Sequence, residues 1–322
     1  YLVLAQEILP GAMTTGSIMM GRALAPVEGA IGNWRGFVMA RGAFKRVAAI
    51  LSEPVPNTSQ LNLPRPAGDL GVEKLVATAP GENVPIIKGI SFGSKAGEVL
   101  GIVGPSAAGK STLARLLVGV WPPSSGHVRL DGADVSTWNH TELGKHIGYL
   151  SQEAELFDGT VSENISRFGE AESQSVIEAA KLAGVHDLVL RLPDGYDTRI
   201  GAGGTVLSGG QRQRIGLARA VYGVPSFVVL DEPNANLDKD GELALQATIQ
   251  ELRRRGTSVV VIAHRSALVR IADRILVLNE GKIEHFGLRE EVLAALAPSP
   301  VNSQENPVHK QIDIVNSGLR SA

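Results

Sequence analysis

The chain has 322 residues, of which 43% are hydrophobic and 4% aromatic, enough for one large domain or two modest ones with a sizeable core. Its 31 basic and 33 acidic side chains give a formal net charge of −2, which argues against the basic surface that nucleic-acid binding usually needs. Cysteine is absent, so a disulfide scaffold and a cysteine-based zinc site are both excluded, and a reducing compartment is permitted.

Residues 1–50 differ in composition from the rest of the chain. They are rich in Ala, Gly, Met, Leu and Ile and carry few charges. The chain starts at Tyr1 rather than Met, and no charged stretch precedes the apolar start, so we expect a fragment whose beginning lies upstream and not a signal peptide. Two interpretations stay open: a buried, amphipathic helix of a soluble domain, or a transmembrane helix from about Gly11 onward.

Charges and small residues bear on the transmembrane interpretation. Any uncharged apolar run of roughly eighteen residues is interrupted, by Glu7, Arg22 and Glu28. Small residues such as Gly16 would let the helix pack closely against neighbours, and the basic cluster within residues 35–46 would mark its cytoplasmic end. One helix over residues 11–51 would be about 60 Å long, twice the ~30 Å hydrocarbon core, so much of it would stand in the cytosol.

The remaining segments also separate by composition. Residues 53–69 hold four prolines and several polar residues, which predicts a linker rather than a packed element. From Leu70, short apolar runs alternate with helical periods, as is typical of an α/β domain built on a mainly parallel sheet. The tail after Pro298 is polar, and we expect it to be mobile. The predicted boundaries are therefore 1–52, 53–69, 70–297 and 298–322.

A glycine-rich loop stands between an apolar strand, VLGIV, and a helical pattern, LARLLVGV. The loop reads GPSAAGKST and fits the pattern G-x-x-x-x-G-K-[ST] in its required context. Small residues let main-chain N–H groups approach phosphate oxygens, and the helix N-terminus adds unpaired donors and a partial positive charge. Lys110 is placed to bridge β- and γ-phosphates, and Ser111 to ligate Mg²⁺. The alternative is a glycine-rich turn with a capping serine. The expected nucleotide contacts are Gly104, Pro105, Ser106, Ala107, Ala108, Gly109, Lys110, Ser111 and Thr112.

Polar side chains also follow three other apolar strands. The strand FVVL ends in Asp231, which could hold Mg²⁺ through water, and Glu232, which could polarise an attacking water. His264 follows the strand SVVVIA at the edge where ligands collect in open α/β sheets, and it could hydrogen-bond a γ-phosphate. Gln152 follows IGYLS in the same way and could touch Mg²⁺ or the water. The alternatives are a pair of acids that cap the next helix and an ordinary core or surface histidine.

A second anion site begins at residue 208. Ser208, Gly209 and Gly210 open the helix QRQRIGLARA, and because the first loop already holds the phosphates, this site suggests a partner's γ-phosphate. The segment LSGGQRQRIGLARA resembles the signature of ATP-binding cassette (ABC) proteins, in which two domains sandwich two ATP molecules head to tail. The resemblance covers Leu70 to about Leu296, and its motifs follow in the family's order.

The resemblance implies a fold and a set of roles. The fold would be an α/β, ABC-type P-loop ATPase domain with a helical subdomain over residues 151–220, preceded by the last transmembrane helix or helices of an exporter. Glu232 and His264 would be catalytic, and Asp238 would end the D-loop. Mg²⁺ would be held by Ser111, Gln152 and, through water, Asp231. The partner's ATP would be contacted by Ser208, Gly209, Gly210 and Gln211.

A narrower resemblance is to the type I secretion ABC transporters, in the protease-secretion branch often called PrtD-type. It is carried by the stretches GRALAPVEGAIGNWRGFVMARGAFKRV, ARLLVGVWPPSSGHVRLDGADVS and DEPNANLD. It implies export of unfolded proteins by a homodimer that works with a membrane-fusion protein and an outer-membrane channel. The chain would lie in the bacterial inner membrane, in contact with lipid, with its nucleotide-binding domain in the cytoplasm. Residues 1–52 would then be the end of the transmembrane domain.

The chain departs from the family pattern at three places. The exporter A-loop aromatic, which stacks on adenine, is expected near Thr78–Ala79 and is absent there, so we expect weaker adenine discrimination, since such stacking contributes ~1–3 kcal/mol per base. Arg199 and Ala202 replace the usual acids of the X-loop, which puts coupling contacts at these positions in doubt. Two alanines, at 107 and 108, stand where Gly-Ser is common, and the cradle should survive because alanine is small.

The sequence therefore predicts an ATP-hydrolysing half-transporter of a type I secretion system. One alternative keeps the ATPase and changes the cargo to a lipid, a peptide or a small molecule. A further alternative is a soluble ABC ATPase that acts on DNA. The slightly acidic charge and the absence of heptad repeats between residues 112 and 207 argue against it.

Overall fold

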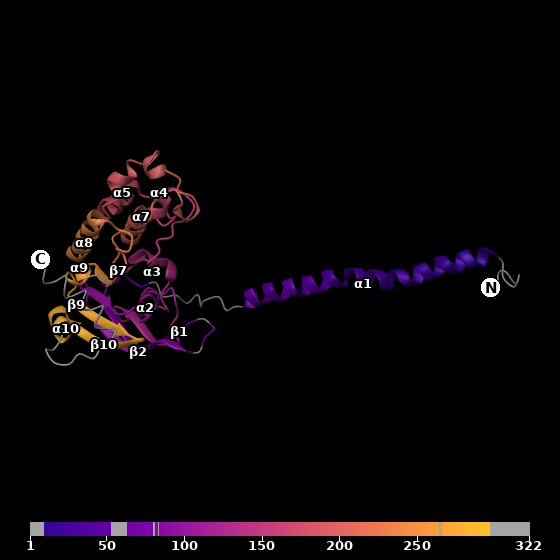
Figure 1. The fold of residues 1–322 in the computed structure, drawn as a ribbon, viewed down its shortest axis with the longest axis horizontal. Coiled ribbons are helices and arrows are strands. Elements are labelled where there is room, and N and C mark those ends of the chain that lie inside the picture. Colours follow the sequence, from indigo (N-terminus) through magenta and orange to yellow (C-terminus); the bar gives the residue numbers. More distant parts are fainter. Residues whose placement is uncertain (1–9, 53–62, 80, 83, 264–265, 297–322) are drawn as a thin grey trace. The chain divides into compact units, whose positions relative to one another are not determined.

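The computed structural model describes residues 10–52, 63–79, 81–82, 84–263 and 266–296. The chain divides into two units, residues 1–59 and 60–322, which are described separately here. The described part of the first unit is one helix, α1 (Pro10–Ser52), with Pro26 inside it (Figure 1). At 43 residues it is about 65 Å long. Among the described residues, no helix contains a continuous apolar stretch that could span a membrane.

The second unit is built on a sheet whose described strands run β10-β9-β3-β8-β7-β6. The pairs β9–β3, β3–β8, β8–β7 and β7–β6 are parallel, and β10 joins β9 antiparallel at the edge. The mainly parallel α/β sheet predicted from the alternating pattern is thereby confirmed. Its strands are β3 (Val99–Val103), β6 (Ile147–Leu150), β7 (Phe227–Asp231), β8 (Ser258–Ile262), β9 (Arg274–Asn279) and β10 (Lys282–Leu288).

A smaller antiparallel sheet, in the order β2-β1-β4-β5, was not predicted. It consists of β1 (Leu70–Thr78), β2 (Pro85–Ser94), β4 (Ser125–Leu130) and β5 (Ala133–Asp134). Asp131 fastens the start of β1 because its carboxylate accepts bonds from the N–H groups of Ala67, Gly68 and Asp69. Residues 63–69, which composition assigned to a linker, are therefore in contact with the domain. Arg65 adds a bond to the carbonyl of Val224 at 2.8 Å.

Helix α2 (Lys110–Leu117) packs against β2 of the small sheet and against β7 and β8 of the parallel sheet. The helices α4, α5 and α7 gather at one end of the second unit, between β6 and β7 in sequence (Figure 1). Their bounds and those of the remaining helices are α3 (His140–His146), α4 (Val161–Ile165), α5 (Ser173–Leu182), α6 (His186–Val189), α7 (Gly209–Val221), α8 (Lys239–Arg254), α9 (Ser266–Val269) and α10 (Arg289–Leu296).

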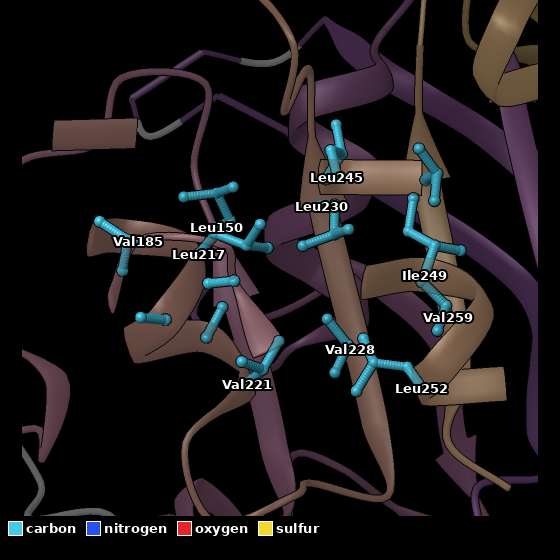
Figure 2. Close-up of a cluster of buried hydrophobic side chains, with 14 of the residues drawn as sticks. Leu150, Val185, Leu217, Val221, Val228, Leu230, Leu245, Ile249, Leu252 and Val259 are labelled. Atoms are coloured by element: carbon cyan, nitrogen blue, oxygen red, sulfur yellow. The ribbon is translucent and has the colours of Figure 1, made fainter. Parts of the chain in front are cut away.

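Two buried clusters fill the faces of the parallel sheet. Successive side chains of a strand point to opposite faces, so Val228 and Leu230 of β7 join one cluster while Phe227 and Val229 join the other. Figure 2 shows the first cluster, in which Val228 and Leu230 meet side chains from β6, β8, α7 and α8. Because both faces are covered, all five residues of β7 are buried, which explains the unbroken apolar run from Phe227 to Leu230 that precedes Asp231. The buried sheet provides a rigid edge for the polar residues that follow each strand.

Candidate functional site

The glycine-rich loop connects β3 to α2, as the sequence predicted. Gly109 is the N-cap residue of α2, with φ of 99°, a left-handed conformation that favours glycine. It has no side chain to accept a bond from the first N–H groups of the helix. These groups therefore remain available for an anion, and the helix dipole adds a partial positive charge at the same place.

The glycines of the loop also serve packing, a role that sequence reasoning missed. A Cβ on Gly104 would lie 2.0 Å from the carbonyl oxygen of Leu278 in β9. A Cβ on Gly109 would lie 2.9 Å from Cδ1 of Ile87 in β2. The loop is thus held between the two sheets, and its main chain approaches both of them more closely than a larger residue would permit.

Lys110 begins α2 and is buried, with only 5% of its surface exposed. Its Nζ donates to the carbonyl oxygens of Gly104 at 3.0 Å and Pro105 at 2.9 Å, so the ammonium group lies across the loop. Burial lowers the pKa of Lys110, while the carboxylates of Glu232 and Asp231 act in the opposite direction. A cation held by two loop carbonyls and near two acids is suited to a phosphate chain, whose oxygens can replace those carbonyls as acceptors.

Asp231 is the last residue of β7 and is 1% exposed. Burial raises the pKa of its carboxyl group, whereas a bond from the Ser111 hydroxyl acts to lower it. Its Oδ1 is buried and makes no hydrogen bond within the described structure. The carboxylate oxygen Oδ1 and the nearby Ser111 hydroxyl are both oxygen ligands of the kind that magnesium prefers.

Other ligands of such an ion would have to come from a phosphate or from water. The described residues hold no group of three or more His, Cys, Asp or Glu side chains that could bind a metal ion by themselves. Mg²⁺ commonly binds through one or two protein groups together with substrate phosphates, so the residues present fit a magnesium-bound nucleotide.

Glu232 follows Asp231 in a left-handed conformation, with φ of 48°. This conformation is unfavourable for a residue with a side chain. Residues held in such conformations cluster at functional sites. The N–H of Glu232 donates to the carbonyl of Ile262 at 3.0 Å, which ties the turn to β8. Its Oε2 accepts a bond from Nε2 of Gln152 at 3.3 Å. The structure thus brings Gln152 and Glu232 together at the end of the parallel sheet. His264 lies outside the described residues.

The signature residues lie at the start of α7. Ser208 is the N-cap residue: its Oγ accepts from the N–H of Gln211 at 3.3 Å, and Oε1 of Gln211 accepts from the N–H of Ser208 at 2.8 Å. This reciprocal pair is a capping box, which the spacing S-x-x-Q could have signalled. A Cβ on Gly210 would lie 2.9 Å from the carbonyl oxygen of Asn236, so the segment packs tightly on the loop before α8.

Asp238 joins the start of α8 to α7. It is the N-cap residue of α8 and accepts from the N–H of Gly241 at 2.9 Å. The same carboxylate oxygen accepts from Nη2 of Arg214 in α7 at 2.5 Å. The ion pair links the proposed D-loop to the signature helix, a link for which the sequence carries no local signal because the two residues are far apart in the chain.

A hollow of about 560 Å³ adjoins Thr78 and Ala79, where the resemblance expects an aromatic residue. Trp121 lines the same hollow, and its ring lies 6.0 Å from the guanidinium carbon of Arg115. An aromatic side chain is therefore present beside the end of β1. This side chain, Trp121, belongs to the segment after α2, so the residues next to β1 in sequence carry no signal for it.

Three comparisons with known proteins agree in kind. Residues 87–235 match a family model described as ABC transporter. The chain is 50% identical over 305 residues to the type I secretion system ATP-binding protein PrsD of Rhizobium meliloti, a match that covers 94% of this chain and 52% of that protein. It is 34% identical over 296 residues to the alpha-hemolysin translocation ATP-binding protein HlyB of Escherichia coli, covering 91% and 42%.

Among solved structures, the chain resembles a bacterial Atm1-family ABC exporter with ATP bound. The TM-score is 0.67 and the sequence identity 33%, over 77% of this chain and 45% of that chain. The chain spans about half the length of the curated relatives it matches, 52% for PrsD.

Proposed function

The chain belongs to the ABC transporter ATPases, and from this premise we propose that it hydrolyses ATP as part of a type I protein exporter. The observation that carries the proposal is the cluster of Lys110, Asp231, Glu232 and Gln152 around the glycine-rich loop. Its cargo class rests on the similarity to PrsD and to HlyB, which are named for secretion and translocation.

In the proposed mechanism, the loop binds the phosphates of ATP through main-chain N–H groups at the start of α2. Lys110 neutralises the β- and γ-phosphates by turning its ammonium group from the loop carbonyls toward them. Ser111, Gln152 and, through water, Asp231 would hold Mg²⁺, which neutralises charge on the phosphates when bound.

Glu232 is the proposed general base. Its carboxylate would orient the attacking water and accept a proton from it, while Gln152, 3.3 Å away, keeps the carboxylate in position. His264 would hydrogen-bond the γ-phosphate. At the start of α7, the residues that would contact the ATP of a second copy are Ser208, Gly209, Gly210 and Gln211. Two copies of the chain would therefore close around two nucleotides.

Residues 1–52 would be the end of the membrane domain, 53–69 the linker, 70–297 the nucleotide-binding domain and 298–322 the tail. Closure of the two nucleotide-binding domains would move the membrane helices and drive export of an unfolded protein. The proposed partners are a membrane-fusion protein and an outer-membrane channel, with the transporter in the inner membrane and its ATPase domain in the cytoplasm.

Comparison of culture supernatants tests the cargo class. Cells would carry the full-length transporter either intact or with Glu232→Gln, and secreted proteins would be identified by mass spectrometry. We expect one or a few proteins to disappear from the medium of the mutant and to accumulate inside the cells. Unchanged secretion by a mutant that has lost ATPase activity would contradict protein export and direct the search to lipids, peptides or small molecules.

A further inference from the structure

Arg167, in the turn after α4, is half-buried, and its guanidinium group donates to main-chain carbonyls of three segments. Two carbonyls come from the last turn of α7 and one from Tyr222, the C-cap residue that follows the helix. The others come from the end of α3 and the start of β6. The acceptors are Arg219 at 3.0 Å, Ala220 at 3.2 Å, Tyr222 at 3.5 Å, Ile147 at 3.1 Å and Gly144. One side chain thus joins α7, α3 and the edge of the parallel sheet.

The chemistry of this cluster requires an arginine. The last carbonyls of a helix lack intrahelical donors and form the negative end of the helix dipole, so a cation at this place is favourable. Burial lowers the pKa of Arg167 to about 10, and the nearby charge of Arg219 acts in the same direction, yet the group remains a cation at neutral pH. A planar fork with five N–H donors serves several acceptors at once, which a lysine cannot do.

The main chain is shaped to direct Arg167 inward. Arg167 and Phe168 have φ of 59° and 58°, a conformation that residues with side chains rarely adopt. The consecutive pair sends the guanidinium group into the protein and leaves Phe168 half exposed, with its ring edge-on to Phe157 at 5.9 Å. A strained turn persists only where surrounding contacts determine it, and here the five carbonyls supply those contacts.

Helix α7 lies against β6 at close range. A Cβ on Gly148 of β6 would lie 2.0 Å from the carbonyl oxygen of Ala220, an acceptor of Arg167. A Cβ on Gly216 would lie 2.9 Å from Cδ1 of Leu150. The end of α7 is therefore held between the sheet and Arg167, while its start carries Ser208. Because the helix is a rod of about 20 Å, a change in tilt at one end displaces the other.

We propose that Arg167 is a positioning residue that fixes the C-terminal end of α7 on the parallel sheet and thereby sets where Ser208–Gly210 are presented. The proposal rests on the proposed function for its consequence in catalysis, since Ser208–Gly210 would meet the ATP of a second copy. It predicts that loss of Arg167 leaves nucleotide binding at the glycine-rich loop intact and impairs closure of two copies.

The first test measures geometry and does not depend on ATP hydrolysis. The chain has no cysteine, so spin labels can be attached at Val206→Cys and Lys282→Cys alone, both at exposed positions in the second unit. With Arg167 intact we expect one narrow distance distribution. Arg167→Met should broaden or shift it, and Arg254→Met, which removes an exposed arginine of α8, should not. An unchanged distribution in folded Arg167→Met would overturn the proposal.

The second test measures kinetics in the same variants. For Arg167→Met we expect kcat for ATP hydrolysis to fall at least about tenfold while the Kd for ATP stays within about twofold. A parallel loss of kcat and of nucleotide binding would indicate a general loss of folded protein and would contradict a positioning role. If Arg167→Met does not fold, Arg167→Lys replaces it, with the same expectations. If the unaltered protein hydrolyses no ATP, the proposed function fails, and the label distances still decide the role of Arg167.

Discussion

Glu232→Gln is expected to lower kcat for ATP hydrolysis by about 10²–10⁴-fold and to leave ATP-driven dimers intact. Glutamine keeps the shape of the side chain and a hydrogen-bonding oxygen for Gln152, which lies 3.3 Å from the carboxylate. It has no basic oxygen to accept a proton from the attacking water. Binding of ATP, which relies on the loop, on Lys110 and on Asp231, has no need of that proton transfer.

The measurement combines phosphate release with the molecular mass of the protein in the presence of ATP. Glu290→Gln is the control, because this carboxylate lies on α10 with 88% of its side chain exposed. Glu232→Gln should form dimers that persist after ATP is added, whereas dimers of the unaltered protein and of the control should dissociate as ATP is consumed. Hydrolysis by purified Glu232→Gln at the rate of the unaltered protein would remove the assignment of Glu232 as base.

Lys110→Met is expected to weaken ATP binding by about 10–100-fold, because the charged hydrogen bonds to the phosphates are lost. Methionine fills much of the space of the lysine stem, so the buried start of α2 should retain its packing. The carbonyls of Gly104 and Pro105 lose their donor in this variant, which adds a modest loss of stability.

Equilibrium titration with a fluorescent ATP analogue measures the change, and thermal unfolding checks that the variant is folded. Lys95→Met serves as the control, since Lys95 is exposed in the turn before β3. An unchanged Kd in folded Lys110→Met would show that the glycine-rich loop is not the phosphate site.

Much of the site could be predicted because its signals are local. The strand, the loop 104–109 and the helix that follows are contiguous in sequence, and buried strands of a parallel sheet read as unbroken apolar runs. The ends of such strands meet at one edge, which brings Gln152 to Glu232 although eighty positions separate them. The sequence could therefore predict that the side chains of Gln152 and Glu232 lie at the same edge of the sheet.

The remainder depends on contacts that no local pattern carries. The antiparallel sheet contains register shifts between β1 and both of its neighbours, so an alternating pattern is broken within β1. Arg167 reads in the sequence as an ordinary surface arginine, and only the folded chain shows its carbonyl acceptors, 20 to 55 positions away. The ion pair of Arg214 with Asp238 is hidden for the same reason.

Mixing two inactive variants tests the central claim, a composite ATP site, most directly. Lys110→Met disables the loop of one copy, and Ser208→Arg obstructs the exposed signature end of the other. In a head-to-tail dimer of the two variants, the loop of the second meets the signature of the first, so one site is intact.

Each variant alone should be nearly inactive, and an equal mixture should recover about a quarter of the unaltered rate, because about half the dimers are mixed and each holds one of two sites. A chain that carries both substitutions, mixed with either single variant, is the control and should recover nothing. A mixture of the two single variants that stays as inactive as its components would contradict the shared site.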